Sequence, residues 1–267
     1  MRLSWAVATH PGLKRESNED AYASRPDLGL FVVADGMGGH AAGEVASKAA
    51  AETIEAFADD TRARDLNRTW PFPLEPHLSV DGNRLKAAFR LANRNVAERV
   101  ATAQELRGMA TTASAVLLST TPDGGASAAI GHVGDSRVYL CRAGQLRQLT
   151  DDHSWVGEQV RAGAMSDEDA RRHPWRNVVT RAISGGADPE VDVLEVGLEP
   201  GDRLLLCSDG LCGVVAAEVL AAIACDGPVE SACNRLIDAA NDAGGPDNIT
   251  AILVQIDGEM PDDPPVT

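Results

Sequence analysis

Three aspartates stand where apolar runs of the sequence stop, and their carboxylates are the first candidates for chemistry. Asp35 follows the apolar run 31–34. Asp209 follows the run 204–207, and Asp247 comes just before the last apolar run of the chain. A strand that ends there would hold each backbone rigidly, and the glycines nearby would let carbonyls and waters approach. Oxygen ligands of this kind suit a hard divalent cation.

Each aspartate has an alternative interpretation as a turn residue. Asp-Gly after a strand is the commonest short hairpin signal, and both Asp35 and Asp209 precede a glycine. Taken together, with no histidine or cysteine ligand set nearby, the three predict a cation site. Spacing alone leaves open whether they converge.

Two further polar segments could serve such a site. Residues 15–20 carry Arg15 and the adjacent acids Glu19 and Asp20. Arginine can hold a phosphate by two parallel hydrogen bonds, and carboxylates can hold metal-bound waters. Asp135 lies in a second short stretch between two apolar runs. Each segment is equally compatible with a solvated turn.

The elements that position these residues follow from hydrophobic periodicity. Eight runs are predicted as strands: 28–35, 111–119, 126–133, 136–142, 145–149, 190–197, 202–207 and 249–256. Four segments are predicted as helices: 42–58, 83–103, 215–224 and 229–242. Ala143-Gly144 is predicted as a hairpin turn. Strands in runs, with paired helices between them, are typical of an α+β fold with antiparallel sheets.

Three segments interrupt this pattern. Residues 59–82 are predicted as a loop, and the polar residues 150–185 as short helices and loops that form a mobile flap. Residues 257–267, rich in proline and acids, are predicted as a disordered tail. We therefore expect one catalytic domain over residues 1–256.

Composition excludes several classes of protein. The chain has 267 residues, enough for one large domain with a sizeable core. Its net charge is −16, and no block of lysine or arginine stands out, which argues against nucleic-acid binding and against docking on anionic lipid. An acidic protein that handles phosphate needs local cations at its site.

The cysteines and the N-terminus predict a reducing compartment. The five cysteines include no C-x-x-C pair, and Cys141, Cys207 and Cys212 lie in apolar surroundings, so we expect buried thiols. The first residues lack a signal-peptide pattern, and no apolar run approaches the roughly 18 residues of a membrane span. We expect a soluble, cytoplasmic protein without membrane insertion.

Six segments together resemble the PPM family, the PP2C-like metal-dependent protein serine/threonine phosphatases, in its bacterial form. They occur in the family's order and span roughly residues 5 to 256: Arg15-Glu16-Ser17-Asn18-Glu19-Asp20, Val33-Ala34-Asp35-Gly36-Met37-Gly38-Gly39-His40, Gly108-Met109-Ala110-Thr111-Thr112, Gly134-Asp135-Ser136-Arg137, Ser208-Asp209-Gly210-Leu211 and Asp247-Asn248-Ile249-Thr250. The resemblance implies an α-β-β-α sandwich of two antiparallel sheets flanked by helix pairs.

The resemblance also implies two Mn²⁺ or Mg²⁺ ions per active site. Asp35 would bridge them, the Gly36 carbonyl would help to hold one, and Asp209 and Asp247 would hold the other. The cations would activate a shared water, which attacks the phosphorus of phosphoserine or phosphothreonine.

The remaining roles implied by the resemblance complete the site. Glu19 and Asp20 would act through metal-bound waters, and Asp135, with Asp209, would hold a weaker third metal. Arg15 would bind the phosphate, so that Arg15 and the aspartates Asp35 and Asp209 carry catalysis. The substrates implied are phosphorylated proteins, including a bacterial serine/threonine kinase and its targets, and we expect a monomer.

One position departs from the family pattern. Animal members carry a histidine directly after the Asp-Gly pair, proposed as the general acid, where this chain has Met37. His40 does not match that position, and His132 and His153 are predicted to be structural. The acid is left open between a metal-bound water, His40 and another group.

The segment 155–176 matches the family's flap. Its arginines, with one just beyond it, would either guide an acidic phosphopeptide or pair with the protein's own acids: Arg161, Arg171, Arg172, Arg176 and Arg181.

Three rival functions are weighed against this one. Cys141 and Arg147 spell C-x5-R, the pattern of a cysteine phosphatase, although Cys141 ends a strand rather than opening an anion-binding loop. A catalytically inactive PP2C-like binding module would be expected to have lost a metal ligand. A two-metal esterase for small phosphate esters or nucleotides would lack the family's protein substrates.

Overall fold

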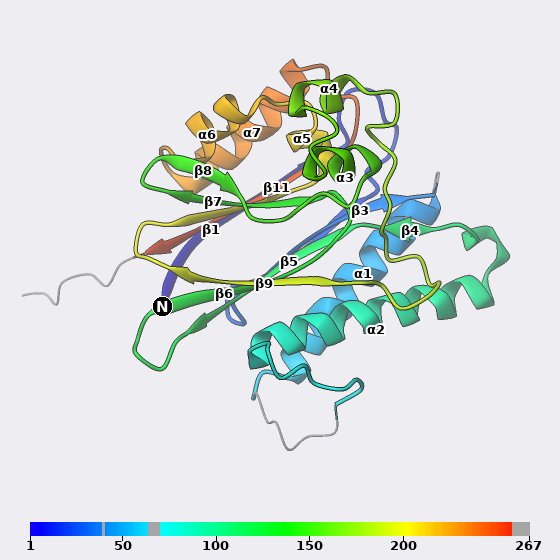
Figure 1. The fold of residues 1–267 in the computed structure, drawn as a ribbon, viewed down its shortest axis with the longest axis horizontal. Helices are drawn as coiled ribbons and strands as arrows, with labels where there is room; N and C mark the ends of the chain where they lie inside the picture. Colours follow the sequence, from blue (N-terminus) through cyan, green and yellow to red (C-terminus); the bar gives the residue numbers. More distant parts are fainter. Residues whose placement is uncertain (39–40, 64–69, 258–267) are drawn as a thin grey trace, which may run out of the picture.

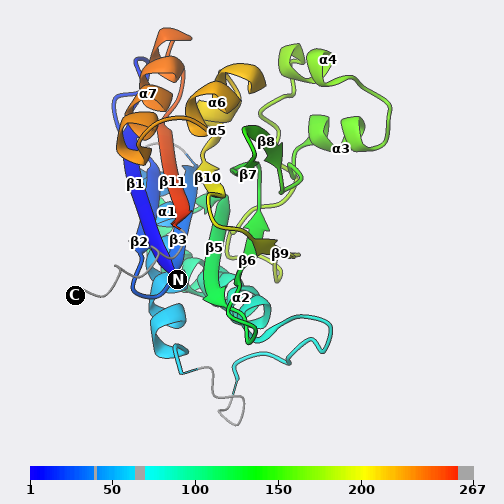
Figure 2. The ribbon, with the colours of Figure 1, turned by 90° about the vertical axis from the view of Figure 1, so that its left-hand side faces the viewer.

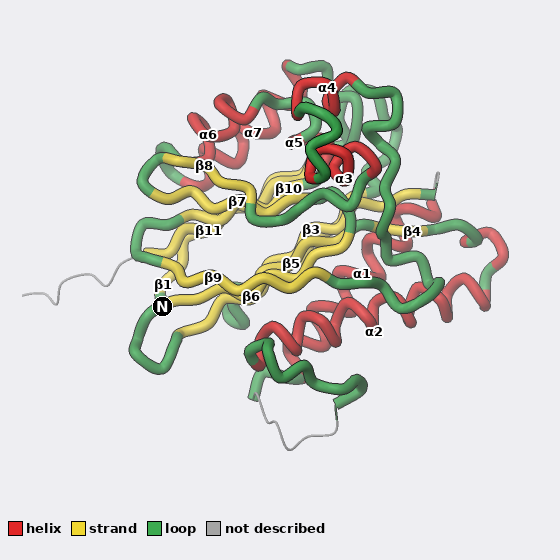
Figure 3. The backbone as a smooth tube through the Cα atoms, in the orientation of Figure 1, coloured by secondary structure: helices red, strands yellow, loops and turns green. Residues whose placement is uncertain are grey.

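Two antiparallel β-sheets lie face to face, with helices on the outer face of each (Figure 1). The computed structural model describes residues 1–38, 41–63 and 70–257. Figure 3 shows the strands as two stacked layers between two helical layers. This is the α-β-β-α sandwich expected from the resemblance.

The sheets contain strands from both halves of the chain. The first has the order β1 (Arg2–His10), β11 (Ile249–Asp257), β10 (Arg203–Cys207), β7 (Arg137–Arg142) and β8 (Gln145–Gln148). The second has the order β2 (Asp20–Arg25), β3 (Leu30–Met37), β5 (Ala113–Thr120), β6 (Ala126–Val133) and β9 (Asp192–Leu198), with β4 (Ala110–Thr111) paired to β3.

The helices cover one sheet each. α1 (Ala41–Asp60) and α2 (Val80–Thr102) pack on the second sheet, whereas α6 (Ala217–Ala224) and α7 (Val229–Asp242) pack on the first. The short helices α3 (Trp155–Arg161), α4 (Asp167–Arg172) and α5 (Asp209–Cys212) and a 3-10 turn, η1 (Gln104–Leu106), complete the described elements. Figure 2 shows α3 and α4 at the same end of the molecule as α5 and α6.

Period-2 alternation explains why the central strands read as continuous apolar runs. In β3, Phe31 and Val33 point between the sheets, while Leu30, Val32 and Ala34 pack against α1 and α2. Both faces of the strand are therefore buried, so every position must be apolar. The run stops at Asp35, where the sheet reaches the edge of the core.

Most predicted elements are confirmed within a few residues. Strand β6 and helix α7 have the predicted bounds, and the hairpin turn is built by Ala143 and Gly144 with φ of 51° and 76°. The prediction missed β1 and β2, which are edge strands of the two sheets with mixed polar and apolar residues. Half-exposed edge strands lack the apolar run that marks a buried one.

The predicted flap region does consist of short helices and loops. An isolated bridge from Thr111 to Ile183 ties this region to β4, and a second bridge, from Ser154 to Val179, joins its two ends to each other. At the C-terminus, Asp257 is the last residue of β11, opposite Arg2, so the predicted tail starts one residue too early. The rest of that tail lies outside the described residues.

The expectation of a buried Cys141 thiol is wrong. Cys141 on β7 forms a disulfide with Cys225 after α6, with Cα atoms 5.7 Å apart. The two residues are 84 positions apart, and only the packing of α6 on the first sheet brings them within bonding range. Cys207, Cys212 and Cys233 are buried free thiols. Within the described residues, no helix is long and apolar enough to cross a membrane.

Candidate metal centre

The polar residues singled out in the sequence gather at one edge of the sandwich. β10 and β11 of the first sheet contact β3 of the second there. A cavity of about 230 Å³ is lined by seven of the eight predicted site residues, Arg15, Glu19, Asp35, Gly36, Asp135, Asp209 and Asp247. The eighth, Asp20, lies opposite Asp35 in the β2–β3 ladder. Segments more than 200 residues apart therefore converge at this edge.

Asp20 is held from one side only. Its Oδ2 accepts hydrogen bonds from Ser208 Oγ at 2.7 Å and Thr250 Oγ1 at 2.6 Å. Its Oδ1 is buried and has no hydrogen-bond partner among the described residues. An unpartnered buried carboxylate oxygen is costly, and a cation or a cation-bound water would satisfy it.

The pKa values of the clustered aspartates also indicate that a cation belongs at this site. Burial raises the pKa of Asp20 to about 7, and it raises the pKa values of Asp35, Asp135 and Asp209 as well. Repulsion from neighbouring carboxylates raises these pKa values further. Asp209 and Asp247 act on Asp20 in this way, and Asp20 acts on Asp35. Several buried like charges are tolerated when divalent cations compensate them.

Backbone contacts around Gly36 leave no room for a side chain. A Cβ at Gly36 would collide with the carbonyl oxygens of Gly43 and Glu19. The Gly36 amide donates to the Glu19 carbonyl at 3.2 Å. A glycine is needed here so that the main chain, with its carbonyl, can lie against the acidic segment.

Asn248 fastens the N-terminal acidic segment to the site. Its Oδ1 accepts from the Glu19 amide at 2.8 Å, and its Nδ2 donates to the carbonyls of Pro11 and Ser17 at 2.9 and 2.8 Å. The sequence interpretation gave no role to Asn248, nor to Ser208 and Thr250. All three lie within the segments that carry the family resemblance, and that resemblance was the signal that could have identified them.

Arg15 stands at the mouth of the cavity. Its Nη2 donates to Asp247 Oδ2 at 2.7 Å, and half of its side chain is exposed. The hydrogen bond to Asp247 raises the pKa of Arg15. A permanently charged, half-exposed guanidinium beside the carboxylates can bind a phosphate that approaches from solvent.

The Gly134–Asp135 turn is supported by a buried histidine pair. The Gly134 amide donates to His153 Nδ1 at 3.1 Å, and the His153 amide donates to the Gly134 carbonyl at 2.7 Å. The His132 ring lies against the His153 ring at an interplanar angle of 42°, with centroids 4.6 Å apart, and its Nδ1 contacts Ser114 Oγ. Both histidines bond to protein groups and neither lines the cavity, which agrees with their predicted structural role. His40 lies outside the described residues.

The donor set suits ions that keep much of their water. Among the described residues, no three carboxylate, imidazole or thiol groups surround a single point. Mg²⁺ and similar hard cations bind through one or two carboxylates each and retain several waters, so a row of shared aspartates fits them better than a closed cage would. The unpartnered Oδ1 of Asp20 and the backbone cradle at Gly36 are consistent with this fit.

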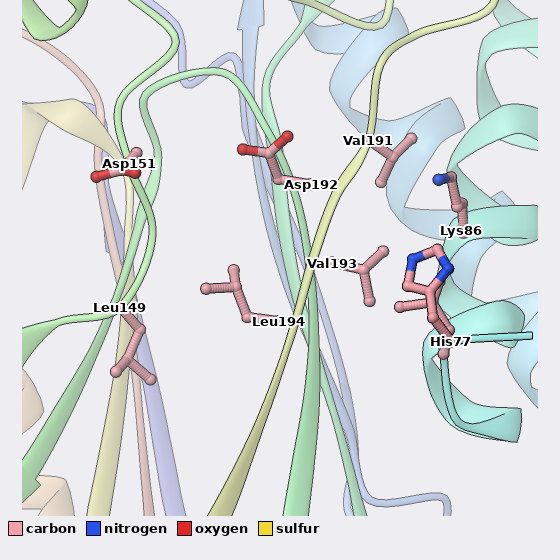
Figure 4. Close-up of a pocket in the computed structure, with 9 residues that line it drawn as sticks. His77, Lys86, Leu149, Asp151, Val191, Asp192, Val193 and Leu194 are labelled. Atoms are coloured by element: carbon pink, nitrogen blue, oxygen red, sulfur yellow. The ribbon is translucent and has the colours of Figure 1, made fainter. Parts of the chain in front are cut away.

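A second depression, of about 350 Å³, lies between β9 and the start of α2 (Figure 4). Its polar groups already have partners: Lys86 Nζ and His77 Nε2 lie 2.5 and 3.5 Å from Glu75, and Asp192 accepts from the His153 ring. Leu194 and Val193 supply an apolar wall. Nothing here converges on an anion or a cation.

The cysteine-phosphatase alternative fails on geometry. The Cys141 sulfur is in the disulfide with Cys225. Cys141 and Arg147 sit on the paired strands β7 and β8, where Arg147 lies opposite Leu140. A β-hairpin, and not an anion-binding loop at a helix N-terminus, joins Cys141 to Arg147, so the C-x5-R match is coincidental.

Comparison with known proteins identifies what this architecture is similar to. Residues 13–253 match the model of the protein phosphatase 2C family. The serine/threonine protein phosphatase PstP of Mycobacterium tuberculosis is 38% identical over 257 residues, which cover 95% of this chain. This chain spans only 45% of the length of PstP. The protein phosphatase PhpP of Streptococcus pneumoniae is 33% identical, with 95% of this chain and 98% of PhpP covered.

A solved structure shows the same fold with metal. The catalytic domain of PstP in complex with two manganese ions superposes with a TM-score of 0.79 at 34% identity, covering 96% of this chain and 99% of that one.

Proposed function

Because the chain belongs to the protein phosphatase 2C family, we propose that it is a metal-dependent protein serine/threonine phosphatase. The observation that carries the proposal is the acidic cavity, which Asp35 of β3, Asp135 of the β6–β7 turn and Asp209 at the start of α5 line beside Arg15, with Asp20 of β2 paired opposite Asp35. The two manganese ions of the PstP catalytic domain support the choice of cation.

The proposed metal ligands are those at the centre of the cavity. Asp35, the Gly36 carbonyl, Asp209 and Asp247 would hold two Mn²⁺ or Mg²⁺ ions. Asp135, with Asp209, would offer a third, weaker position. Bound there, the cations would activate a water for attack on phosphorus and offset the charge of the phosphate.

The chain's own residues then have distinct tasks. Arg15 would bind the phosphate oxygens and orient the ester for in-line attack. Glu19 and Asp20 would accept hydrogen bonds from cation-bound waters, with Asp20 oriented by Ser208 and Thr250. We propose that the proton for the leaving oxygen comes from a water; of the described residues no histidine lines the cavity, and His40 lies outside them.

The proposed substrates are phosphoserine and phosphothreonine proteins, with the chain opposing a serine/threonine kinase. The similarity to PstP and PhpP, both protein phosphatases, supports this proposal. We propose that residues 1–256 act as one catalytic domain and as a monomer that binds no nucleic acid, in keeping with a net charge of −16.

The test is an assay on a phosphothreonine peptide with Mn²⁺, with EDTA, and with Asp209→Asn. Turnover that needs Mn²⁺ and is abolished by both EDTA and the substitution is expected. Turnover that survives EDTA would reject the metal-dependent reaction. A folded protein that binds Mn²⁺ without turnover would indicate a PP2C-like binding module, and preference for nucleotides over phosphopeptides would indicate a small-ester hydrolase.

A cytoplasmic location is part of the proposal, and the disulfide offers its test. Disulfides are rare in the cytosol. If the protein resides there, alkylation under denaturing conditions after an acid quench of intact cells is expected to label Cys141 and Cys225. Protection of that pair while denatured Cys207 and Cys233 react would instead indicate an oxidising compartment.

A further inference from the structure

A larger cavity, distinct from the depression beside β9, continues from the metal centre beneath the short helices α3 and α4. It has a volume of about 620 Å³ and shares Arg15, Asp135, Asp209 and Asp247 with the acidic cavity. We call it the flap cavity, since α3 and α4 form one wall and α5 with the start of α6 the other. It extends well beyond the aspartates that would act on a phosphate.

The α5–α6 wall of the flap cavity is apolar. Val214, Val215, Ala217 and Leu220 line it, and Val156 and Val160 of α3 face the same space. A wall of this kind accepts the aliphatic parts of a bound peptide and excludes water from its contacts.

The flap wall carries positive charge that no carboxylate of the described residues neutralises. Arg171 and Arg176 line the cavity and are exposed. Among the described residues, neither guanidinium lies within 4.0 Å of a carboxylate, although the chain has a net charge of −16. Both arginines are thus available to an anionic ligand.

The other arginines of the region behave differently. Arg172 pairs with Glu168 at 3.0 Å, and Arg181 pairs with Glu190 and Asp192, both at 3.1 Å. Arg161 donates to the Asp152 carbonyl at 2.8 Å. Neither Arg172 nor Arg181 lines the flap cavity. Contacts within the protein therefore account for Arg172, Arg181 and Arg161, the last of which also lines the cavity, but not for Arg171 and Arg176.

Aromatic stacking supports the segment between the two free arginines. Trp155 stacks on His173 and meets Trp175 edge to face, each with ring centroids 4.9 Å apart. Ser166 caps α4 through the Asp169 amide at 3.1 Å. The backbone that carries Arg171 and Arg176 is thus braced against α3, which lowers the entropic cost of holding a ligand.

From these contacts we propose that the flap cavity binds the chain on one side of the phosphorylated residue and selects acidic side chains there through Arg171 and Arg176. The inference rests on the proposed phosphatase function and names the class of its substrate. A phosphopeptide with aspartate or glutamate near the phosphothreonine would place carboxylates against the two guanidinium groups and its aliphatic stems against α5–α6.

The test compares two phosphothreonine peptides that differ only in flanking Glu or Gln residues. Wild type is expected to have a kcat/KM about tenfold higher for the acidic peptide, mainly because KM is lower. Two solvent-exposed charge pairs would give an effect of about this size. The double variant Arg171→Gln, Arg176→Gln should lose this preference. Arg172→Gln, one residue away but outside the cavity, should keep it.

Hydrolysis of a small aryl phosphate separates this inference from the proposed function. If wild type cleaves neither the aryl ester nor the peptides, the phosphatase function fails. If it cleaves them with equal kcat/KM for both peptides, the function stands and the acidic preference is rejected. If the double variant retains the preference, Arg171 and Arg176 do not produce it, and the inference is overturned.

Discussion

The Arg15 guanidinium donates to the Asp247 carboxylate at 2.7 Å, which joins residues 232 positions apart at the mouth of the acidic cavity. The side chains are 52% and 30% exposed, so solvent screens the pair and a phosphate can reach Arg15. A phosphate-binding cation is thereby held beside a proposed metal ligand. Changes at the two positions should affect substrate and metal in different ways.

Substitution Arg15→Gln is expected to weaken phosphopeptide turnover without weakening metal binding. Losing charge-assisted hydrogen bonds to the phosphate removes about 1.5–3 kcal/mol of transition-state stabilisation, which lowers kcat/KM roughly 10- to 150-fold. Mn²⁺ affinity, measured by calorimetry, should stay equal or increase because a positive charge has gone. Weaker Mn²⁺ binding by Arg15→Gln would contradict this assignment.

Substitution Asp247→Asn should give the opposite profile. It removes a carboxylate from the proposed metal site while the Arg15 charge remains. Mn²⁺ affinity should fall about tenfold or more, and raising the Mn²⁺ concentration should recover part of the turnover. Unchanged Mn²⁺ affinity in this variant would remove Asp247 from the ligand set.

Asp209→Asn is expected to raise the stability of the metal-free protein while abolishing turnover. Asp209 is buried among other carboxylates, and burial with repulsion from Asp247 disfavours its charge. Neutralising it should raise the melting temperature in EDTA by about 2–4 °C per kcal/mol gained, with a gain of roughly 1–2 kcal/mol.

The same variant should lose most of the stabilisation that Mn²⁺ gives wild type, because its metal affinity has fallen. Asp188→Asn, at an exposed position, is the matched control and should leave both melting temperatures unchanged. A lower melting temperature in EDTA for Asp209→Asn would show that the carboxylate contributes more through hydrogen bonding than it costs.

Sequence reasoning predicted what a local pattern encodes. The central strand β3 was predicted because both of its faces are buried, and Asp35 was located because the apolar run ends there. Edge strands β1 and β2 were missed because half of their side chains meet solvent and no apolar run marks them. Burial on one face leaves a weaker signal than burial on both.

What the sequence could not predict is long-range pairing between unlike elements. The hydrogen bonds from Ser208 and Thr250 to Asp20 join three segments whose spacing carries no information about contact. The Cys141–Cys225 disulfide likewise depends on how α6 packs against β7. The convergence of the acidic residues was expected only from the family resemblance, since spacing alone is equally compatible with isolated turns.

Arg84 is expected to contribute strongly to the free energy of unfolding, although it lies outside the proposed metal site. It is 4% exposed and donates to Asp81 at 2.7 Å, Thr61 Oγ1 at 3.0 Å and the Ala58 carbonyl at 2.6 Å, which ties the end of α1 to the start of α2. Arg84→Ala leaves buried acceptors unpaired and should cost about 3–5 kcal/mol in the free energy of unfolding by urea.

Arg172→Ala provides the matched comparison, since its pair with Glu168 is 80% and 74% exposed. That variant should change the free energy of unfolding by less than about 0.5 kcal/mol. Equal losses in the two variants would mean that burial does not set the strength of these pairs.

The buried His132 should make the protein less stable in acid. Burial, with a smaller effect of His153, lowers the pKa of His132 to about 4, against about 6.5 in an unfolded chain. Between these values the unfolded state binds more protons, so the free energy of unfolding falls as pH drops from about 6.5 to about 4. The full effect is about 3 kcal/mol.

In His132→Gln, the free energy of unfolding should therefore depend less on pH in the acid range. It should also be lower than that of wild type near neutral pH. Urea unfolding of both proteins from pH 7.5 to pH 4.5 isolates the histidine, because the titrating aspartates are common to wild type and variant and cancel in the difference. His77→Gln, at a side chain 73% exposed, should show the wild-type slope. If His132→Gln has the same slope as wild type, the imidazole is not held neutral by burial, and the acid sensitivity arises elsewhere.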